Sequence, residues 1–385
     1  MPTQTLIHSA RLVSSGRILE NGWVLFDDDR DAAVGQGDPF PSDADDTERT
    51  VVDAAGRWLT PGFIDIHGHG GGGAAFDEGE DAIRTALAIH RSHGTTRSVL
   101  SLVTGAVPDL ERELAVIADA VRRDPLILGS HLEGPFLEDS HRGAHDPSLL
   151  RTADPDSIER MLSAAAGTLI QVTLAPELPG GMAALRQFVD ASVAVAVGHC
   201  GAGYDETRAA FDAGASILTH AFNAMPGIHH RAPGPVMAAM DTPGVTLEVI
   251  NDGVHVHPSV VRLAFEGADG RIALITDAMA ATGSSDGEYQ LGSLRVEVVN
   301  GVARLAGGGS IAGSTLTLDT ALRLAVTSVG LPIDVAVRAL TETPARAIGR
   351  EGDLGQLATG FAADAVLLGS DFTVEGVWGA GRRLA

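Results

Sequence analysis

Eight short, mainly apolar runs, separated by segments with a helical pattern, constrain the fold of this chain more than any other feature. Their length and their content of valine, isoleucine and leucine are typical of buried strands. The runs cover residues 63–66, 95–103, 126–132, 169–174, 193–197, 216–218, 247–250 and 272–275. Repeated strand-then-helix order implies a parallel sheet, and eight such units over about 250 residues are typical of a (β/α)8 barrel. We therefore predict an α/β protein built on a TIM barrel.

The two ends of the chain predict a second, smaller domain. Short β-like runs at residues 6–13, 23–26 and 50–53 precede the barrel, and runs at 363–368 and 374–378 follow it. Because the tail returns to β character, we expect it to pair with the N-terminal strands as a small second domain. The predicted limits are 1–60 and 351–385 for this domain and 61–350 for the barrel.

The sequence also predicts the structure of several segments outside the strands. A helix is expected over residues 77–93, where Gly94 would end it, and another begins at Asp154-Pro155 and ends at Gly167. The acidic stretch 27–48 predicts a loop. After the last strand we expect an inserted hairpin and two helices, at residues 287–304, 316–329 and 333–340.

The charge of the chain excludes several classes of function. The net charge is −23, with 50 acidic and 27 basic residues, so its field repels nucleic acid and anionic membranes, and we expect neither as a partner. All 27 basic residues are arginine. A chain without lysine has no Schiff-base lysine, no phosphate-loop lysine and no lysine carbamate between two metal ions.

We expect the protein to lie in the cytoplasm. No run approaches the roughly 20 apolar residues that cross a bilayer, and the first residues lack the basic and apolar regions of a signal peptide. The single cysteine, Cys200, forms no internal disulfide, which agrees with a reducing compartment.

Polar residues with metal-binding chemistry follow five of the eight predicted strands. Active sites of TIM barrels lie at the carboxyl ends of the strands, so these residues are expected to gather at one rim. They are His67 and His69, Glu133, His199, His220 and Asp277. One buried histidine is usually an ordinary core residue, whereas ligands at five equivalent positions indicate a metal centre.

The donor set narrows the choice of ion. Histidine and carboxylate without thiolate suit zinc, iron or manganese, and the spacing does not choose among them. Because the chain has no lysine, Glu133 is the residue expected to bridge two ions. We expect His67, His69 and Glu133 to bind one ion, and Glu133, His199 and His220 to bind the other.

Asp277 has two possible roles, as a further ligand or as a proton acceptor. We expect the second role, since hydrolytic water needs a base as well as a Lewis acid. His131 lies on the same strand face as Glu133 and is expected to hold a ligand in place. Cys200 would point away from the site, so we assign it no role there.

Eight sequence blocks resemble the amidohydrolase superfamily and, within it, the deacetylases of phosphorylated amino sugars. His-Leu-Glu-Gly-Pro at 131–135 and His-x-x-Asn-Ala-Met at 220–225 are the most specific. The blocks lie at 61–70, 131–136, 143–145, 198–199, 219–226, 252–255, 275–279 and 305–314 and so span nearly the whole chain.

The resemblance implies a TIM barrel with a small β-sandwich built from both termini. It also implies hydrolysis of N-acetylglucosamine 6-phosphate to glucosamine 6-phosphate and acetate, a step of amino-sugar catabolism. One or two divalent ions per subunit are implied, with zinc expected and iron, manganese or cobalt as alternatives. Family members without the His-x-His pair use one ion, so His67 and His69 allow two here.

The resemblance further implies roles for individual residues. Asp277 corresponds to the general acid/base and His145 to the group that polarises the acetamide carbonyl. Arg231 would reach the active site of a neighbouring subunit, which implies a homodimer. The implied substrate contacts are Ala144, Asn223, Ala224, Arg231, His255, Ile311, Ala312 and Gly313.

In so acidic a protein, a phosphate dianion needs a cationic pocket. The cationic side chains must lie close to the phosphate, because salt screens electrostatic attraction beyond about 8 Å. The run His229-His230-Arg231 is a basic cluster near the rim that could supply one. The segment 137–142 matches the family only loosely, so its contacts with substrate stay open.

Two alternatives remain from the residues alone. Another amidohydrolase could act on a different N-acyl or cyclic amide, although many of these need a carbamylated lysine, and Ala175-Pro176-Glu177 at the end of the fourth strand offers none. A barrel that binds metal without turnover is the other alternative. Structural metal sites tend to be closed by protein ligands. An additional carboxylate, Asp277, beside five candidate ligands argues against such a structural site.

Overall fold

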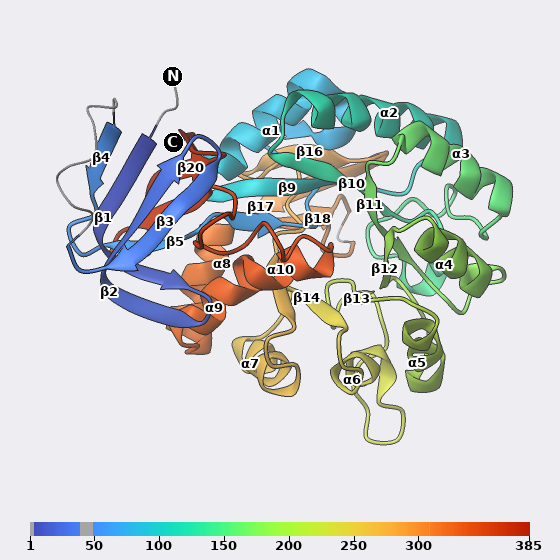
Figure 1. The fold of residues 1–385 in the computed structure, drawn as a ribbon. Coiled ribbons are helices and arrows are strands. Elements are labelled where there is room, and N and C mark those ends of the chain that lie inside the picture. The colour runs from blue at the N-terminus through green and yellow to red at the C-terminus, as the bar shows by residue number, and fades with distance from the viewer. Residues whose placement is uncertain (1–3, 39–48, 308) are drawn as a thin grey trace. The chain divides into compact units, whose positions relative to one another are not determined.

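The computed structural model describes residues 4–38, 49–307 and 309–385. The chain divides into two compact units (Figure 1). The first unit comprises Met1–Asp65, His90–Arg97 and Leu318–Ala385, and the second comprises Ile66–Ile89 and Ser98–Thr317. The domain boundaries predicted at residues 60 and 350 therefore remain predictions.

Eight parallel strands of the described chain form a nearly closed barrel, which confirms the predicted fold. Their order in the sheet is β15-β14-β13-β12-β11-β10-β9-β6. Nearly all of their residues are buried, as expected for a parallel sheet that is covered on both faces. The strands are β6 (Phe63–Asp65), β9 (Thr95–Leu102), β10 (Ile127–Glu133), β11 (Leu169–Leu174), β12 (Ala194–Val197), β13 (Ile217–Leu218), β14 (Thr246–Ile250) and β15 (Ile272–Ile275).

Beyond the ends of β6 and β15 the backbone closes the ring. The amide of Asp277 donates a hydrogen bond to the carbonyl of His67, with N and O 2.9 Å apart. These two residues lie at the strand ends where the sequence predicts a metal centre. The hydrogen bond therefore brings the first and last strand ends of the barrel together.

Helices lie around the outside of the barrel strands (Figure 1). The helix α3 begins where predicted, because Asp154 accepts a hydrogen bond from the amide of Ser157 and Pro155 occupies the first turn. The helix α1 (Glu80–Ser92) begins later than predicted, since Gly79, at φ +99°, separates it from a short 3-10 turn. The others are α2 (Val107–Arg123), α3 (Pro155–Ala165), α4 (Gly181–Asp190), α5 (Tyr204–Asp212), α6 (Gly234–Met240) and α7 (Pro258–Gly267).

Strands from both chain ends form a second sheet, so the predicted small domain is confirmed. The C-terminal strand β19 pairs antiparallel with β5, in the order β21-β20-β19-β5-β1-β2-β3, and β4 pairs with β1. Its core combines residues from both termini, such as Phe26, Leu59 and Trp378. The strands are β1 (Gln4–Ser14), β2 (Arg17–Asp27), β3 (Arg30–Gln36), β4 (Arg49–Asp53), β5 (Trp58–Pro61), β19 (Ala365–Leu368), β20 (Val374–Gly379) and β21 (Arg382–Arg383).

The prediction of a loop over residues 27–48 is wrong for its first part. Strand β3 pairs antiparallel with β2, and the buried side chain of Asp31 accepts a hydrogen bond from the amide of Ala358 at 2.9 Å. Burial raises the pKa of Asp31 to about 9, so its carboxyl group is neutral and is tolerated inside the strand, which composition does not show. Residues 39–48 lie outside the described residues.

The remaining elements agree with their predictions, with local differences. The predicted hairpin is β16 (Gly287–Leu291) and β17 (Leu294–Val299), and β18 (Val302–Leu305) extends it. The helical segment that follows α8 (Leu318–Leu324) ends in a π-helical turn, Ala325–Val329. The helices α9 (Ile333–Leu340) and α10 (Glu342–Ala347) come next. In the described part of the chain, no helix combines the length and apolar content needed to cross a bilayer.

A buried ion pair within the first unit generates a stability prediction. Arg97 Nε lies 2.6 Å from Asp364 Oδ2, and both side chains are only 8% exposed. Replacing Asp364 with alanine removes the charge opposite a buried guanidinium. We expect Asp364→Ala to lower the free energy of unfolding by about 3–5 kcal/mol. Denaturation followed by tryptophan fluorescence reports on this unit, because Trp23, Trp58 and Trp378 lie in its sheet.

The matched control is Glu375→Ala, which breaks an ion pair with Arg57 in the same unit. Its side chains are 36% and 40% exposed, so the expected loss is only about 0–1 kcal/mol. Equal losses in the two variants would contradict the prediction.

Candidate active site

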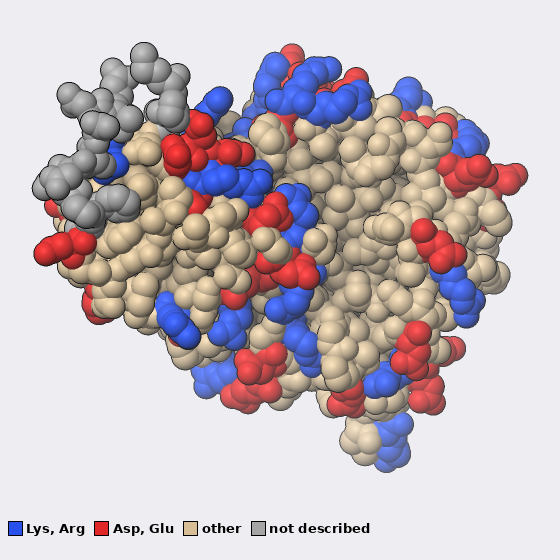
Figure 2. Space-filling model, in the orientation of Figure 1, with Lys and Arg blue, Asp and Glu red and all other residues tan. Residues whose placement is uncertain are grey.

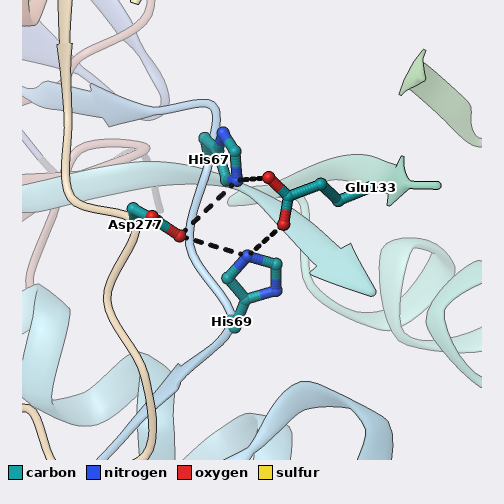
Figure 3. A group of neighbouring side chains, drawn as sticks. All are labelled: His67, His69, Glu133 and Asp277. Atoms are coloured by element: carbon teal, nitrogen blue, oxygen red, sulfur yellow. Dashed lines mark ion pairs between the residues drawn. The ribbon is translucent and has the colours of Figure 1, made fainter. Parts of the chain in front are cut away.

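The carboxylate of Glu133, at the end of β10, lies at the centre of the site (Figure 3). His67 Nε2 is 3.3 Å from Glu133 Oε1, and His69 Nε2 is 3.2 Å from Oε2. Asp277 faces the same two rings, with its Oδ1 3.6 Å from His67 Nε2 and 3.3 Å from His69 Nε2. Four side chains from three strand ends thus surround one small volume.

Three further histidines approach Glu133. The Nε2 atoms of His199 and His220 lie 3.0 and 3.1 Å from Oε1, and His145 Nε2 lies 3.4 Å from Oε2. The two Nε2 atoms of His199 and His220 are themselves 3.0 Å apart. Among the described residues, five imidazoles therefore converge on one carboxylate, and all are buried.

Unusual backbone conformations aim several of these side chains. His199, His220 and Asp277 have φ values of +47°, +24° and +48°. Residues other than glycine rarely adopt this region, and such strain persists where the surrounding structure imposes it. The strand ends turn at these positions, which directs the side chains toward the rim.

In three of the rings, Nδ1, the nitrogen that faces away from Glu133, has a hydrogen-bond partner. His67 Nδ1 lies 3.0 Å from Glu248 Oε2, His199 Nδ1 lies 3.0 Å from the carbonyl oxygen of His141, and His145 Nδ1 lies 2.9 Å from Thr104 Oγ1. Each ring therefore presents Nε2 to the centre of the site. Metal-binding histidines are typically oriented in this way by a partner on the other nitrogen.

His131 packs behind the ligands. Its ring lies edge-on to His67, with centroids 4.6 Å apart. Ser101 Oγ and Thr173 Oγ1 lie 2.9 Å from its two nitrogens. The predicted supporting role of His131 fits this position, and the predicted exclusion of Cys200 fits its full burial.

The charges of the site favour ionised carboxylates. Burial alone would raise the pKa of Glu133, but the charge on His67 and hydrogen bonds from His145, His199 and His220 lower it well below its ordinary value. Burial likewise opposes ionisation of Asp277, yet His69 lowers its pKa. Both carboxylates are therefore negatively charged.

The same carboxylates favour positive charge on two of the rings. Burial opposes the charged form of His69, but hydrogen bonds with Asp277 and Glu133 raise its pKa to about 9. Glu133 and Glu248 likewise overcome burial and raise the pKa of His67 well above its ordinary value. The protons on these two rings therefore lie beside the carboxylates, at positions where a metal cation would replace them.

Two overlapping groups of residues could hold a metal ion. One contains His67, His69, Glu133 and Asp277, and the other contains Glu133, His145 and His199. In each group the candidate ligand atoms lie within 4.8 Å of one another. Imidazole and carboxylate donors at this spacing, with the outer nitrogens of several rings already occupied, fit a divalent ion. Asp277 lies in the first group, so its position is compatible with either role considered from sequence.

A cavity of about 380 Å³ opens above this cluster. Ala312 lies beside it, buried in a hydrophobic cluster with Met279, and Arg231 does not line it. Arg231 is exposed, with Nη1 2.8 Å from His230 Nε2. The other implied substrate contacts line the cavity, namely Ala144, Asn223, Ala224, His255, Ile311 and Gly313.

Sequence reasoning missed Glu248 and Gln171. Both lie inside apolar strand runs, are fully buried and are joined by a hydrogen bond of 2.8 Å from Gln171 Nε2 to Glu248 Oε1. A charged residue in the middle of a buried strand was the available signal, because burial of a carboxylate requires partners. It also missed Leu291 of β16, which lines the cavity.

Comparisons with known proteins agree on one family. The model of the amidohydrolase family matches residues 58–384. The chain is 45% identical, over the full length of both chains, to a solved structure of N-acetyl-D-glucosamine-6-phosphate deacetylase from Mycobacterium smegmatis, a mutant in complex with N-acetyl-D-glucosamine-6-phosphate, with a TM-score of 0.94.

Two curated relatives are 37% identical to this chain. One is an N-acetylgalactosamine-6-phosphate deacetylase from Escherichia coli O157:H7, aligned over 94% of this chain and 95% of the relative. The other is an N-acetylglucosamine-6-phosphate deacetylase from Vibrio furnissii, aligned over 84% and 82%. With its barrel, its rim of histidines and these matches, the chain belongs to the amidohydrolase family.

Proposed function

We propose that this chain hydrolyses the acetamide of N-acetylglucosamine 6-phosphate to glucosamine 6-phosphate and acetate, as a step of amino-sugar catabolism in the cytoplasm. The observation that carries the proposal is the convergence of five imidazoles and Asp277 around Glu133, at the floor of a cavity of about 380 Å³. The likeness to deacetylases over nearly the whole chain supports this substrate class.

We assign His67, His69 and Glu133 to one divalent ion, and Glu133, His199 and His220 to a second. Zinc is the proposed metal, with iron, manganese or cobalt as alternatives, because the donors are nitrogen and oxygen. When bound, a divalent ion polarises an amide carbonyl and lowers the pKa of water. Glu133 has a nearby partner in both groups, so it is suited to bridge them.

Asp277 and His145 are the proposed catalytic residues. As an ionised carboxylate, Asp277 accepts the proton of the attacking water and returns it to the departing sugar nitrogen. Burial and the charge on His199 lower the pKa of His145 to about 4, so its ring is neutral. The amide of Thr104 donates to His145 Nδ1 at 3.3 Å, which leaves the proton on Nε2 to bind the acetamide oxygen.

The phosphate requires positive charge, and histidines supply it within the described lining of the cavity. His255 Nδ1 lies 2.6 Å from Asp252 Oδ2. Burial opposes the charged form of His255, but this contact with Asp252 raises its pKa. An imidazolium held in this way is suited to bind the sugar phosphate.

Arg231 is the second proposed phosphate contact, from a neighbouring subunit of a homodimer. Residues 227–232 are all exposed, and Ile228 is 43% exposed among them. The loop that leads into α6 projects from the barrel, and basic side-chain atoms lie at its tip (Figures 1 and 2). Such a loop offers an apolar residue and a cation to a second copy of the chain, while its own cavity lacks an arginine in its described lining.

The first test is the reaction itself. The purified protein is expected to release acetate from N-acetylglucosamine 6-phosphate far faster than from the unphosphorylated sugar. Incubation with a chelator should abolish the activity, and added zinc should restore it. Release from N-acetylgalactosamine 6-phosphate, measured in parallel, identifies the preferred sugar. Full activity after complete metal removal would overturn the proposal.

Asp277→Asn separates the proton-transfer role from a ligand role. We expect kcat to fall by about 10²–10⁴-fold, because the base is lost while the size of the side chain is kept. Elemental analysis should find the same metal content as in the unchanged protein. Loss of metal from the variant would instead make Asp277 a required ligand.

Arg231→Ala tests the phosphate contact. The KM for the phosphorylated sugar should rise by at least tenfold, since an ion-paired hydrogen bond contributes about 1.5–3 kcal/mol. Hydrolysis of the unphosphorylated sugar should change little. Arg295→Ala, an exposed arginine elsewhere in the barrel unit, serves as the control. Equal losses on both sugars would contradict the assignment.

A further inference from the structure

A second carboxylate, that of Glu248, lies below the ligand cluster. Glu248 is in the middle of β14 and is fully buried. It does not line the cavity, so it has no contact with a substrate bound there. Neither a catalytic nor a ligand role was proposed for it above.

Three donors surround this carboxylate. His67 Nδ1 lies 3.0 Å from Oε2, the backbone amide of His220 donates to Oε2 at 3.3 Å, and Gln171 Nε2 donates to Oε1 at 2.8 Å. Burial of an isolated carboxylate costs several kcal/mol, and donors of this kind offset that cost. The two oxygens of Glu248 together accept from all three donors.

The two contacts of Oε2 lead to the two proposed ions. His67 belongs to the first proposed ligand set and His220 to the second. By accepting the Nδ1 proton, Glu248 keeps His67 Nε2, which faces Glu133 3.3 Å away, as the nitrogen that would bind a metal ion. Its other contact holds the backbone of His220 where φ is +24°. One atom therefore constrains a ligand of each set.

Two described neighbours, His131 and Gln171, make different contacts. His131 packs against the ring of His67, but its own nitrogens face Ser101 and Thr173. Gln171 contacts Glu248 through its Nε2, on the oxygen that does not touch the ligands. Gln171 is thus placed to hold Glu248, and Glu248 to hold the histidines.

We propose that Glu248 is a positioning residue that sets both ion positions from one buried group, by orienting the ring of His67 and anchoring the backbone of His220. The inference rests on the metal assignment of the proposed function. Glu248 acts through the ligands, so it should govern how tightly metal binds, and the substrate should be bound normally once metal is present.

Glu248→Gln tests this inference, because it keeps the size of the side chain and removes its charge. We expect the affinity of the metal-free protein for zinc to fall by 10–100-fold, measured by competition with a chromophoric chelator. Saturating zinc should restore most of kcat, with KM unchanged.

Two further variants keep the test decisive. Gln171→Met loosens Glu248 without altering any ligand, so a smaller loss of zinc affinity is expected even if Glu248→Gln folds poorly. Thr246→Val is the matched control, since Thr246 is buried on the same face of β14, two residues before Glu248. The zinc affinity of Thr246→Val should stay within about twofold of that of the unchanged protein, because none of the contacts described above joins Thr246 to a proposed metal ligand.

The outcomes separate this inference from the proposed function. If the unchanged protein binds zinc and deacetylates, but Glu248→Gln and Gln171→Met bind zinc as tightly as it does, the positioning role is wrong. A loss of folding stability without any change in zinc affinity would also overturn it. If the unchanged protein neither binds zinc nor releases acetate, the proposed function itself fails.

Discussion

The structure of the site depends on the carboxylate of Glu133. A buried carboxylate is costly, and this one is stabilised because imidazoles from other strand ends point their Nε2 atoms at it. The imidazoles in turn are stabilised by the carboxylates around them, which raise the pKa of His67 and His69. Neither set of charges would be buried without the other. A metal cation would replace the protons of the rings among these carboxylates, and the chemistry proposed for Asp277 and His145 requires such an ion.

The barrel makes this mutual stabilisation possible. Parallel strands end at the same rim, so one residue beyond each strand suffices to bring distant parts of the chain together. Beneath the ligands, Gln171 donates a hydrogen bond to Glu248, and Thr173 forms hydrogen bonds with Thr219 and His131. In the role proposed for Glu248, this inner layer orients the rings, so the candidate metal centre draws on two layers of the barrel rather than on the rim alone.

Much of the fold was predictable because its signals are local. The eight strand runs and the helix start at Asp154 follow from apolar patterning and from one capping side chain. The predicted loop at 27–48 was wrong where β3 forms, because Asp31 is neutral when it is buried and its hydrogen-bond donor, the amide of Ala358, is far along the chain. Glu248 was missed for the same reason, since its three donors come from three other strand regions.

The sequence by itself determined the barrel and the residue types at its rim, since periodicity and strand ends are properties of short segments. Tertiary structure alone decided how those residues meet. Asp277 proved to lie as close to His69 as Glu133 does, Ala312 lies beside the cavity, and Arg231 lies outside it. Positive φ values at His199 and His220 aim the rings, and only the packing of the complete barrel holds such backbone conformations. Distances between strands, and the charges they bring together, arise only when the sheet closes.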